Sequence, residues 1–238
     1  DVCGGMAVGR YFDYKGYRYV ALLPVSYCYL QRNSAFVVTA LVLAALLAFF
    51  TFILVKLTRA TAKLEARTAA DLALARTIQM SALPSADGAF MECMEFTLAA
   101  ECCPAREVGG DFYDFFHVNG DRLAFLVADV SGKGVPAALF MVIAKTLIKN
   151  YTQMGMDPCH VFTKVNDLLC EGNEADLFVT AWMGVLDVET GTLTYVNAGH
   201  NPPMIKLADG GFTYLKSIPG FVLAGLEETR YTQSKLTM

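Results

Sequence analysis

The chain has 238 residues, a formal net charge of −4 at pH 7 and a hydrophobic fraction of 55%. The length suits one sizeable domain with an accessory segment, and the hydrophobic fraction is high for a purely soluble protein. Because the charge provides no basic field, we expect no nucleic-acid partner.

Residues 1–34 are too short to form a folded domain alone. Two strand-like runs meet at Lys15-Gly16, and the chain opens on Asp1 rather than on methionine. The segment resembles the membrane-proximal end of a Cache-type sensor domain. We therefore expect residues 1–34 to be the tail of a larger extracytoplasmic, sensor-like module.

Residues 35–55 form an apolar stretch with no charge and no helix breaker. As a helix, the stretch is roughly 30 Å long, which matches the hydrocarbon core of a bilayer. The alternatives are a buried core helix or the apolar region of a signal peptide, which is usually shorter and closer to a basic N-terminus. The pattern favours a single transmembrane helix.

Basic residues crowd the C-terminal side of this stretch, at Lys56, Arg59, Lys63 and Arg67. Positive charge is enriched on the cytoplasmic side of membrane spans. We therefore expect a cell-membrane protein, single-pass in this chain, with residues 56–238 in the cytoplasm.

The seven cysteines agree with this division. Cys3 and Cys28 would lie outside, where a disulfide is permitted. The other five would be cytoplasmic, and the absence of a Cys-x-x-Cys pair argues against a zinc site. These five are Cys93, Cys102, Cys103, Cys159 and Cys170.

Residues 56–84 have the composition of a helical linker, which Pro84 ends. Leu57, Leu64 and Ile78 share one heptad position, but Asp71 interrupts it. Such a seam is too polar for a strong coiled coil. The linker is therefore either a solvated spacer or the stalk of a weak parallel homodimer.

Residues 85–238 have the pattern of an α+β domain, with strands, then two helices, then further strands. The predicted helices are Val135–Gln153 and Pro158–Cys170, the second with Asp157 as its cap. The predicted strands are Phe96–Glu101, Phe112–Val118, Leu123–Ala128, Leu177–Leu186, Leu193–Asn197, Met204–Leu207 and Phe212–Leu215.

Two aspartates flank a predicted hairpin. Asp111 precedes the first strand, Asp129 ends the second, and the turn contains Asn119-Gly120, the strongest short hairpin signal. The hairpin would bring both carboxylates to one end of the sheet, where they suit Mg²⁺ or Mn²⁺. Taken singly, Asp111 could be a turn residue and Asp129 a helix cap.

Three ordered motifs resemble those of SpoIIE/RsbU-type phosphatases, which belong to the metal-dependent PPM protein phosphatase superfamily. The motifs are Glu107–Asp114, Ala128–Ala138 and Asn197–Pro202, and the linker segment Ala75–Pro84 is also similar. The resemblance covers roughly residues 72–238. It implies a β-sandwich of two antiparallel sheets flanked by helices, incomplete in this chain.

The resemblance also implies a centre of two Mn²⁺ or Mg²⁺ ions. Asp129 would bridge the ions, Asp111 would be a further ligand, and the carbonyl of Val130 would complete the available set. Two metal ions activate a shared water for in-line attack, so the protein needs no nucleophile of its own. The implied substrate is phosphoserine or phosphothreonine on a partner protein, such as an anti-sigma-factor antagonist.

Four more residues are expected beside the ligands or near the substrate. Asp114 matches the second aspartate of the first motif. Gly110 and Gly132 allow close approach of the backbone. His200 lies in the third motif, although a lone histidine is more often structural.

The family pattern continues with an Asp-Gly motif on a later strand and then a final aspartate ligand. We therefore expect two ligands beyond residue 238, and weak or absent metal binding and activity in this chain by itself.

The leading hypothesis is a membrane-tethered protein serine/threonine phosphatase regulated by an extracytoplasmic signal. The alternative is a catalytically silent module that uses the same fold to bind a partner. A nucleotide cyclase fits poorly, because Phe-Tyr-Asp follows the Gly-Gly-Asp turn.

Overall fold

The computed structural model of the chain describes residues 7–84, 96–104, 106–218 and 220–238. The chain divides into two compact units, Asp1–Thr68 and Ala69–Met238. Cys3 and Cys93 lie outside the described residues, as does the side chain of Cys28, so their predicted roles stay predictions.

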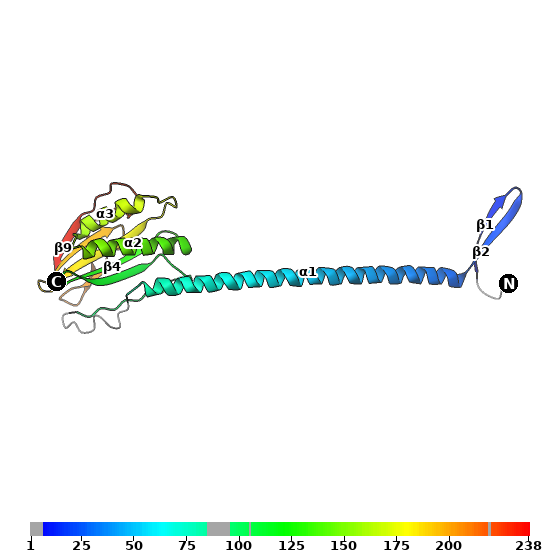
Figure 1. Cartoon of the computed structure of the whole chain (residues 1–238), viewed down its shortest axis with the longest axis horizontal. Coiled ribbons are helices and arrows are strands. Elements are labelled where there is room, and N and C mark those ends of the chain that lie inside the picture. Colours follow the sequence, from blue (N-terminus) through cyan, green and yellow to red (C-terminus); the bar gives the residue numbers. More distant parts are fainter. Residues whose placement is uncertain (1–6, 85–95, 105, 219) are drawn as a thin grey trace. The chain divides into compact units, whose positions relative to one another are not determined.

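The first unit contains a hairpin and most of one long helix (Figure 1). Strands β1 (Ala7–Tyr14) and β2 (Tyr17–Pro24) pair in antiparallel fashion, and the turn lies at Lys15-Gly16, as predicted. Both turn residues have positive φ, 52° at Lys15 and 78° at Gly16. Such a turn matches the right-handed twist of the flanking strands.

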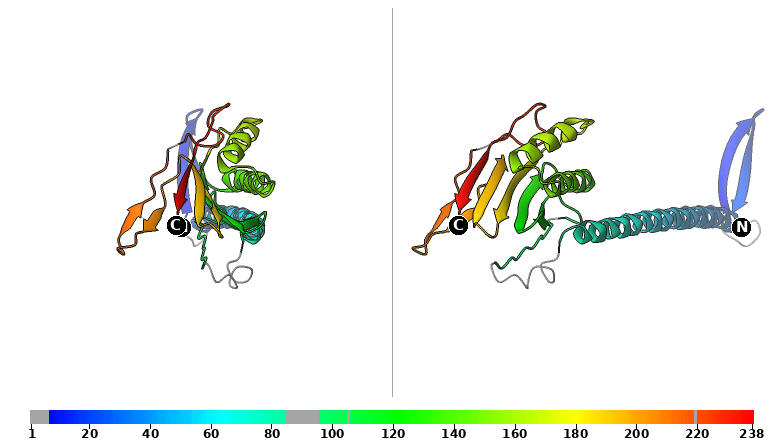
Figure 2. Two further views of the ribbon diagram at one scale, coloured as in Figure 1. Left: turned by 90° about the vertical axis from the view of Figure 1, so that its left-hand side faces the viewer. Right: turned by 60° about the vertical axis from the view of Figure 1, so that its left-hand side comes forward.

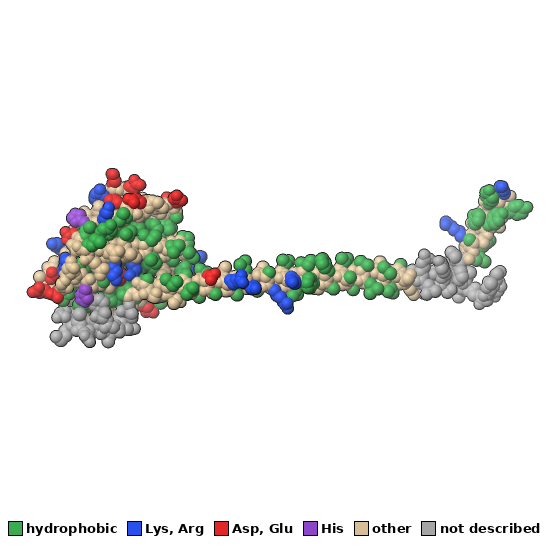
Figure 3. Space-filling model, in the orientation of Figure 1, with side chains coloured by type: hydrophobic (Ala, Val, Ile, Leu, Met, Phe, Trp, Pro, Cys, Tyr) green, Lys and Arg blue, Asp and Glu red, His purple; other side chains and the backbone are tan. Residues whose placement is uncertain are grey.

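Helix α1 (Val25–Ser81) contains both the predicted membrane span and most of the predicted linker without a break. Residues 35–55 are all exposed, and the most apolar 18-residue window has a mean hydropathy of 2.8. Figure 3 shows hydrophobic side chains along this part of α1, followed by lysine and arginine side chains. The helix is thus long and apolar enough to cross a membrane.

The second unit is built on a five-stranded antiparallel sheet with the strand order β3-β4-β5-β6-β9. Helices α2 (Val135–Gln153) and α3 (Pro158–Cys170) cover one face of this sheet (Figures 1 and 2). The strands are β3 (Phe112–Val118), β4 (Arg122–Val130), β5 (Val179–Asp187), β6 (Thr192–Ala198) and β9 (Gln233–Thr237).

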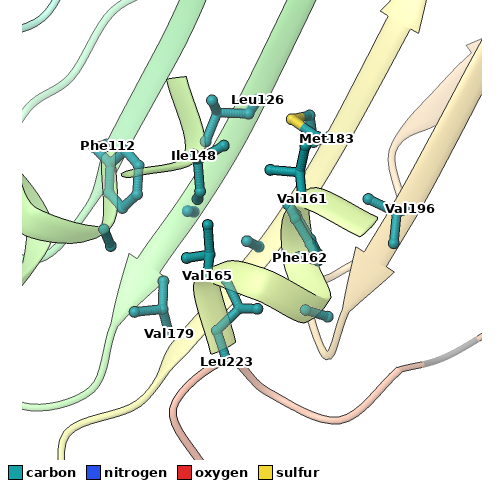
Figure 4. Packing of buried hydrophobic residues seen from close by; sticks show 14 of the residues in the cluster. Phe112, Leu126, Ile148, Val161, Phe162, Val165, Val179, Met183, Val196 and Leu223 are labelled. Atoms are coloured by element: carbon teal, nitrogen blue, oxygen red, sulfur yellow. The ribbon is translucent and has the colours of Figure 1, made fainter. Parts of the chain in front are cut away.

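The main core lies between the sheet and the two helices. Side chains from β4 and β5, such as Leu126 and Met183, meet Ile148 of α2 and Phe162 of α3 (Figure 4). Neighbouring residues along a strand point to opposite faces. Asp111 is next to Phe112, and Asp129 lies between Ala128 and Val130, whose side chains belong to this core. The side chains of Asp111 and Asp129 therefore point to the opposite face of the sheet.

A second antiparallel sheet lies against that opposite face. It consists of β7 (Met204–Lys206) and β8 (Phe212–Tyr214). Leu215 and Ile205 pack against Trp182 and Tyr195 of the large sheet. The α+β class with two antiparallel sheets and outer helices is confirmed.

One predicted strand is absent from the described residues 96–104. Phe96–Glu101 is irregular chain that packs Phe96, Leu98 and Ala100 against Phe115 and Leu123. Its alternating apolar side chains pack against the sheet, although the segment is not a strand. Conversely, β9 was not predicted, although its residues pair with β6 along their whole length.

Candidate metal centre

The β3–β4 hairpin brings Asp111 and Asp129 together. In its register Phe112 lies opposite Ala128, so the next position places Asp111 beside Asp129. Gly120, with φ of 71°, forms the turn at the other end. The pair lies at the end of the hairpin away from the turn, as the sequence predicted.

The two carboxyl groups interact directly. Burial, together with the neighbouring Asp111 carboxyl group, raises the pKa of Asp129 to about 6. Two neighbouring carboxylates repel each other until a proton or a cation lies between them. The pair therefore favours a bound cation at neutral pH.

Gly110 makes the backbone approach that this arrangement needs. A Cβ atom at Gly110 would lie 2.7 Å from the carbonyl oxygen of Val130 and 3.0 Å from the Val130 Cβ. Only glycine fits so close to another backbone. The segment that carries Asp111 is thus packed directly on the segment that carries Asp129 and Val130.

The loop after Val130 is held in a conformation that favours glycine. Gly132 has φ of 85° and Gly134 has φ of 76°. The Ser131 amide donates to the carbonyl of Phe178 at 2.8 Å, and the Ser131 hydroxyl accepts from the Phe178 amide at 2.9 Å. These bonds anchor the loop to the start of β5.

A cleft of about 450 Å³ opens beside the aspartate pair. It runs from Asp111 and Asp129 past Val130 and the 131–134 loop. Arg106 and Lys133, both exposed, line it and add positive charge. The cleft therefore offers a negative end to a cation and a positive flank to an anion.

His200 lies on the other side of the pair. It lines a second cleft, of about 200 Å³, together with Asp111 and Asp129. Burial lowers the pKa of His200, although the charge of Asp111 opposes this effect. The structure thus places His200 at the site, whereas the sequence alone was also consistent with a purely structural histidine.

Asp114 is not brought to the site. It lies on the helix-covered face of β3, where its carboxylate accepts a hydrogen bond from Lys145 of α2 at 2.6 Å and from the amide of Phe115 at 2.9 Å. The ion pair is almost fully buried, with side-chain exposures of 9% for Lys145 and 0% for Asp114. Strand alternation explains the difference, since three positions separate Asp114 from Asp111.

Gln79, at the end of α1, lies in the family-like segment Ala75–Pro84, but sequence reasoning assigned it no role. This buried side chain donates to the carbonyl of Gly109 at 2.7 Å and accepts from the amide of Gly109 at 3.2 Å. Thirty residues separate the two partners, and no local sequence pattern predicts such a contact. Two more residues were also missed: Arg106, which lines the cleft, and Thr180, whose hydroxyl lies 2.9 Å from Nδ1 of His200.

The donors at the pair suit part of a metal site. Among the described residues, no group of three or more histidine, cysteine, aspartate and glutamate side chains is placed to hold a metal ion. Asp111, Asp129 and the carbonyl of Val130 nevertheless offer oxygen donors, which hard cations such as Mg²⁺ and Mn²⁺ prefer. The set fits such an ion but is not a complete shell.

Comparison with known proteins supports a single family. The family described as Stage II sporulation protein E (SpoIIE) matches residues 119–238, just over half of the chain. Protein IcfG of Synechocystis is 31% identical over 174 residues, which cover 62% of this chain and 27% of IcfG. The phosphoserine phosphatase RsbU of Bacillus subtilis is 28% identical over 136 residues, which cover 57% of this chain and 40% of RsbU.

Solved structures agree on the fold. The PP2C domain of SiaA from Pseudomonas aeruginosa has a TM-score of 0.60 at 20% identity, and the match covers 73% of this chain and 68% of that one. The RsbU and RsbW domains of a Mycobacterium tuberculosis protein have a TM-score of 0.50 at 27% identity, covering 57% of this chain and 37% of that one.

The match takes in well under half the length of the two curated relatives. The second and third motifs lie inside the segment that matches the family. The β3–β4 hairpin places Asp111, from the first motif, beside Asp129, from the second. On these grounds, the chain belongs to the SpoIIE family.

Proposed function

We propose that this protein is a membrane-tethered serine/threonine phosphatase that acts on a phosphorylated signalling protein in the cytoplasm. The observation that carries the proposal is the placement of Asp111 beside Asp129 in one cleft, in a chain of this family. RsbU and RsbP of Bacillus subtilis, two of the relatives, are named phosphoserine phosphatases.

Asp111, Asp129 and the carbonyl of Val130 would hold the Mn²⁺ or Mg²⁺ ions. When bound, two such ions lower the pKa of a water molecule and neutralise the charge of the phosphoryl oxygens. Gly110 keeps the two metal-binding segments in backbone contact. Arg106 and Lys133 place positive charge along the cleft through which a phosphorylated segment would approach.

The remaining segments would supply location and control. Residues 35–55 would span the cell membrane, residues 1–34 would belong to an extracytoplasmic module, and residues 56–84 would link that module to the phosphatase domain at 85–238. In support, α1 runs unbroken from the apolar span through most of the linker. A homodimer through the linker would let an external signal alter the activity of both domains.

The test is Mn²⁺-dependent release of phosphate from a phosphoserine peptide by the full-length protein. We expect Asp129→Asn to lower kcat by more than about a hundredfold, since it removes a direct ligand. Asp121→Asn, an exposed aspartate in the hairpin turn, is the matched control and should keep full activity.

Equal activity in Asp129→Asn and the wild type would reject the two-metal assignment. No turnover by the wild type, combined with binding of a partner protein, would instead identify a silent signalling module.

A further inference from the structure

The backbone of His200 is held by the side chain of Asn197. The Asn197 Oδ1 atom accepts from the His200 amide at 2.8 Å, and the Asn197 Nδ2 atom donates to the His200 carbonyl at 2.9 Å. Asn197 is only 5% exposed, and its Nδ2 atom also lies 3.2 Å from the Ser217 hydroxyl. Gly199, with φ of 68°, completes the tight turn. The position of His200 is therefore set by buried groups.

The imidazole ring is held as well. Its Nδ1 atom lies 2.9 Å from the Thr180 hydroxyl. Thr180 is paired with Asp129 across β4 and β5, and its hydroxyl also lies 3.5 Å from the Asp129 carbonyl. The imidazole ring is thus held by Thr180, which is paired with Asp129. The ring lines the same cleft as the carboxylates of Asp111 and Asp129.

The ring nitrogen Nε2 bonds to no described residue, which leaves it for a ligand. The Thr180 hydroxyl has a single proton, and its 2.9 Å contact with Nδ1 is much shorter than its 3.5 Å contact with the Asp129 carbonyl, so we assign that proton to Nδ1. A neutral ring then carries its own proton on Nε2 and donates there. A protonated Nε2 does not bind a metal ion, but it bonds well to an anionic oxygen. A side chain held by its own partners is a feature of preorganised sites.

Building on the proposed function, we propose that His200 contacts the substrate's phosphoryl group and donates a hydrogen bond from Nε2 to one of its non-bridging oxygens. Asn197 and Thr180 are then positioning residues that hold the donor next to the carboxylate pair. In this way two residues of the third motif, Asn197 and His200, gain a specific role in recognising phosphate.

The experiment uses the full-length protein and inorganic phosphate, the reaction product, as the probe. The measurements are the inhibition constant for phosphate, kcat and KM for a phosphoserine peptide, and the dissociation constant for Mn²⁺. The variants are His200→Ala, His200→Gln, Thr180→Val and Asn197→Asp. His160→Ala, an exposed histidine on α3, is the matched control.

We expect His200→Ala to raise the inhibition constant for phosphate about tenfold, the effect of one lost hydrogen bond to a charged group, and to lower kcat/KM equally. His200→Gln should recover part of both losses, because its amide can donate from a similar position. Thr180→Val and Asn197→Asp should each raise the inhibition constant about threefold. The Mn²⁺ dissociation constant should stay within about twofold throughout.

Phosphate inhibition and kcat/KM equal to the wild type in His200→Ala would overturn the inference. A loss of Mn²⁺ affinity beyond about tenfold would also overturn it, because the ring would then be a metal ligand. If His200→Ala does not fold, the nearly isosteric Thr180→Val decides, and an unchanged inhibition constant rejects the inference. Wild-type turnover in Asp129→Asn would reject the proposed function and this inference with it. If Asp129→Asn loses turnover, the proposed function stands, and the His200 variants then test the phosphate contact separately.

Discussion

Asp111 and Asp129 are neighbours at the end of the β3–β4 hairpin, one position beyond the paired residues Phe112 and Ala128, and they line the same cleft. Burial and the charge of Asp111 raise the pKa of Asp129 from 3.8 to about 6. A group whose pKa is raised by folding stabilises the fold fully below its unfolded pKa, and this stability is lost as the pH rises through the folded value. The metal-free fold should therefore lose stability between about pH 4 and pH 6.

Asp129→Asn should stabilise the metal-free protein at neutral pH. The shift corresponds to about 3 kcal/mol for a buried group, but Asp129 is exposed enough for solvent to screen it, so we expect about 1 kcal/mol. Thermal unfolding in the presence of a chelator should show a midpoint about 3 °C higher at pH 7.5 and unchanged at pH 4. Equal midpoints at both pH values would show that the carboxylates do not repel each other.

Gly110→Ala should disturb the fold and the metal site together. The added methyl group would lie 2.7 Å from the Val130 carbonyl oxygen, so the two metal-binding segments must move apart. We expect a loss of about 1–3 kcal/mol in stability and weaker Mn²⁺ binding, measured by thermal unfolding and by titration. Gly109→Ala is the matched control, because its new methyl group would meet Pro104 at an ordinary 3.4 Å. Equal effects in both variants would contradict this role for Gly110.

Lys145→Met should destabilise the fold, because it leaves the buried carboxylate of Asp114 unpaired. Breaking a buried ion pair on one side typically costs about 3–5 kcal/mol. The double variant Asp114→Asn, Lys145→Met should recover much of that loss, as chemical denaturation would show. Because Asp114 faces away from the aspartate pair, the double variant should keep its Mn²⁺ affinity. If the double variant lost as much Mn²⁺ affinity as Asp129→Asn, Asp114 would instead belong to the metal site.

Gln79→Met should weaken Mn²⁺ binding, although Gln79 does not reach the aspartate pair. The side chain bonds both polar groups of the Gly109 peptide, two residues before Asp111. Methionine has a similar length but leaves these groups unpaired, at a cost of about 2 kcal/mol. Ser81→Ala is the control, since the Ser81 hydroxyl donates to the carbonyl of Ile78 within its own helix and to no other described residue. Unchanged Mn²⁺ affinity in Gln79→Met would show that Gly109 stays in place without this contact.

The elements that the sequence predicts well are those with local signals. Both helices of the second unit have the predicted bounds, because a proline lies at the start of each. The Asn119-Gly120 turn lies midway between Asp111 and Asp129, so the register that pairs them follows from counting residues. The same counting puts Asp114 on the helix-covered face of the sheet, whereas the resemblance implied a place beside the metal ligands or near the substrate.

The features that the sequence does not reveal depend on distant partners. The contacts of Gln79 with Gly109 and of Asp114 with Lys145 join residues about thirty positions apart. The 96–101 segment alternates like a strand, yet apolar alternation cannot distinguish a paired strand from irregular chain packed on a sheet. Such outcomes are decided by which backbone groups find partners in three dimensions.

The orientation of α1 can be tested by labelling single cysteines. Residues 35–55 are apolar and exposed, and lysine and arginine side chains follow them. These charges should keep the following segment in the cytoplasm. In a cysteine-free protein, Asp13→Cys should react with a membrane-impermeant maleimide in intact cells, and Lys63→Cys only after permeabilisation. Both sites are exposed, so accessibility within the protein does not bias the comparison. Labelling of both sites in intact cells would rule out a span between them. The reverse pattern would place the second unit outside the cell, which contradicts the proposed cytoplasmic function.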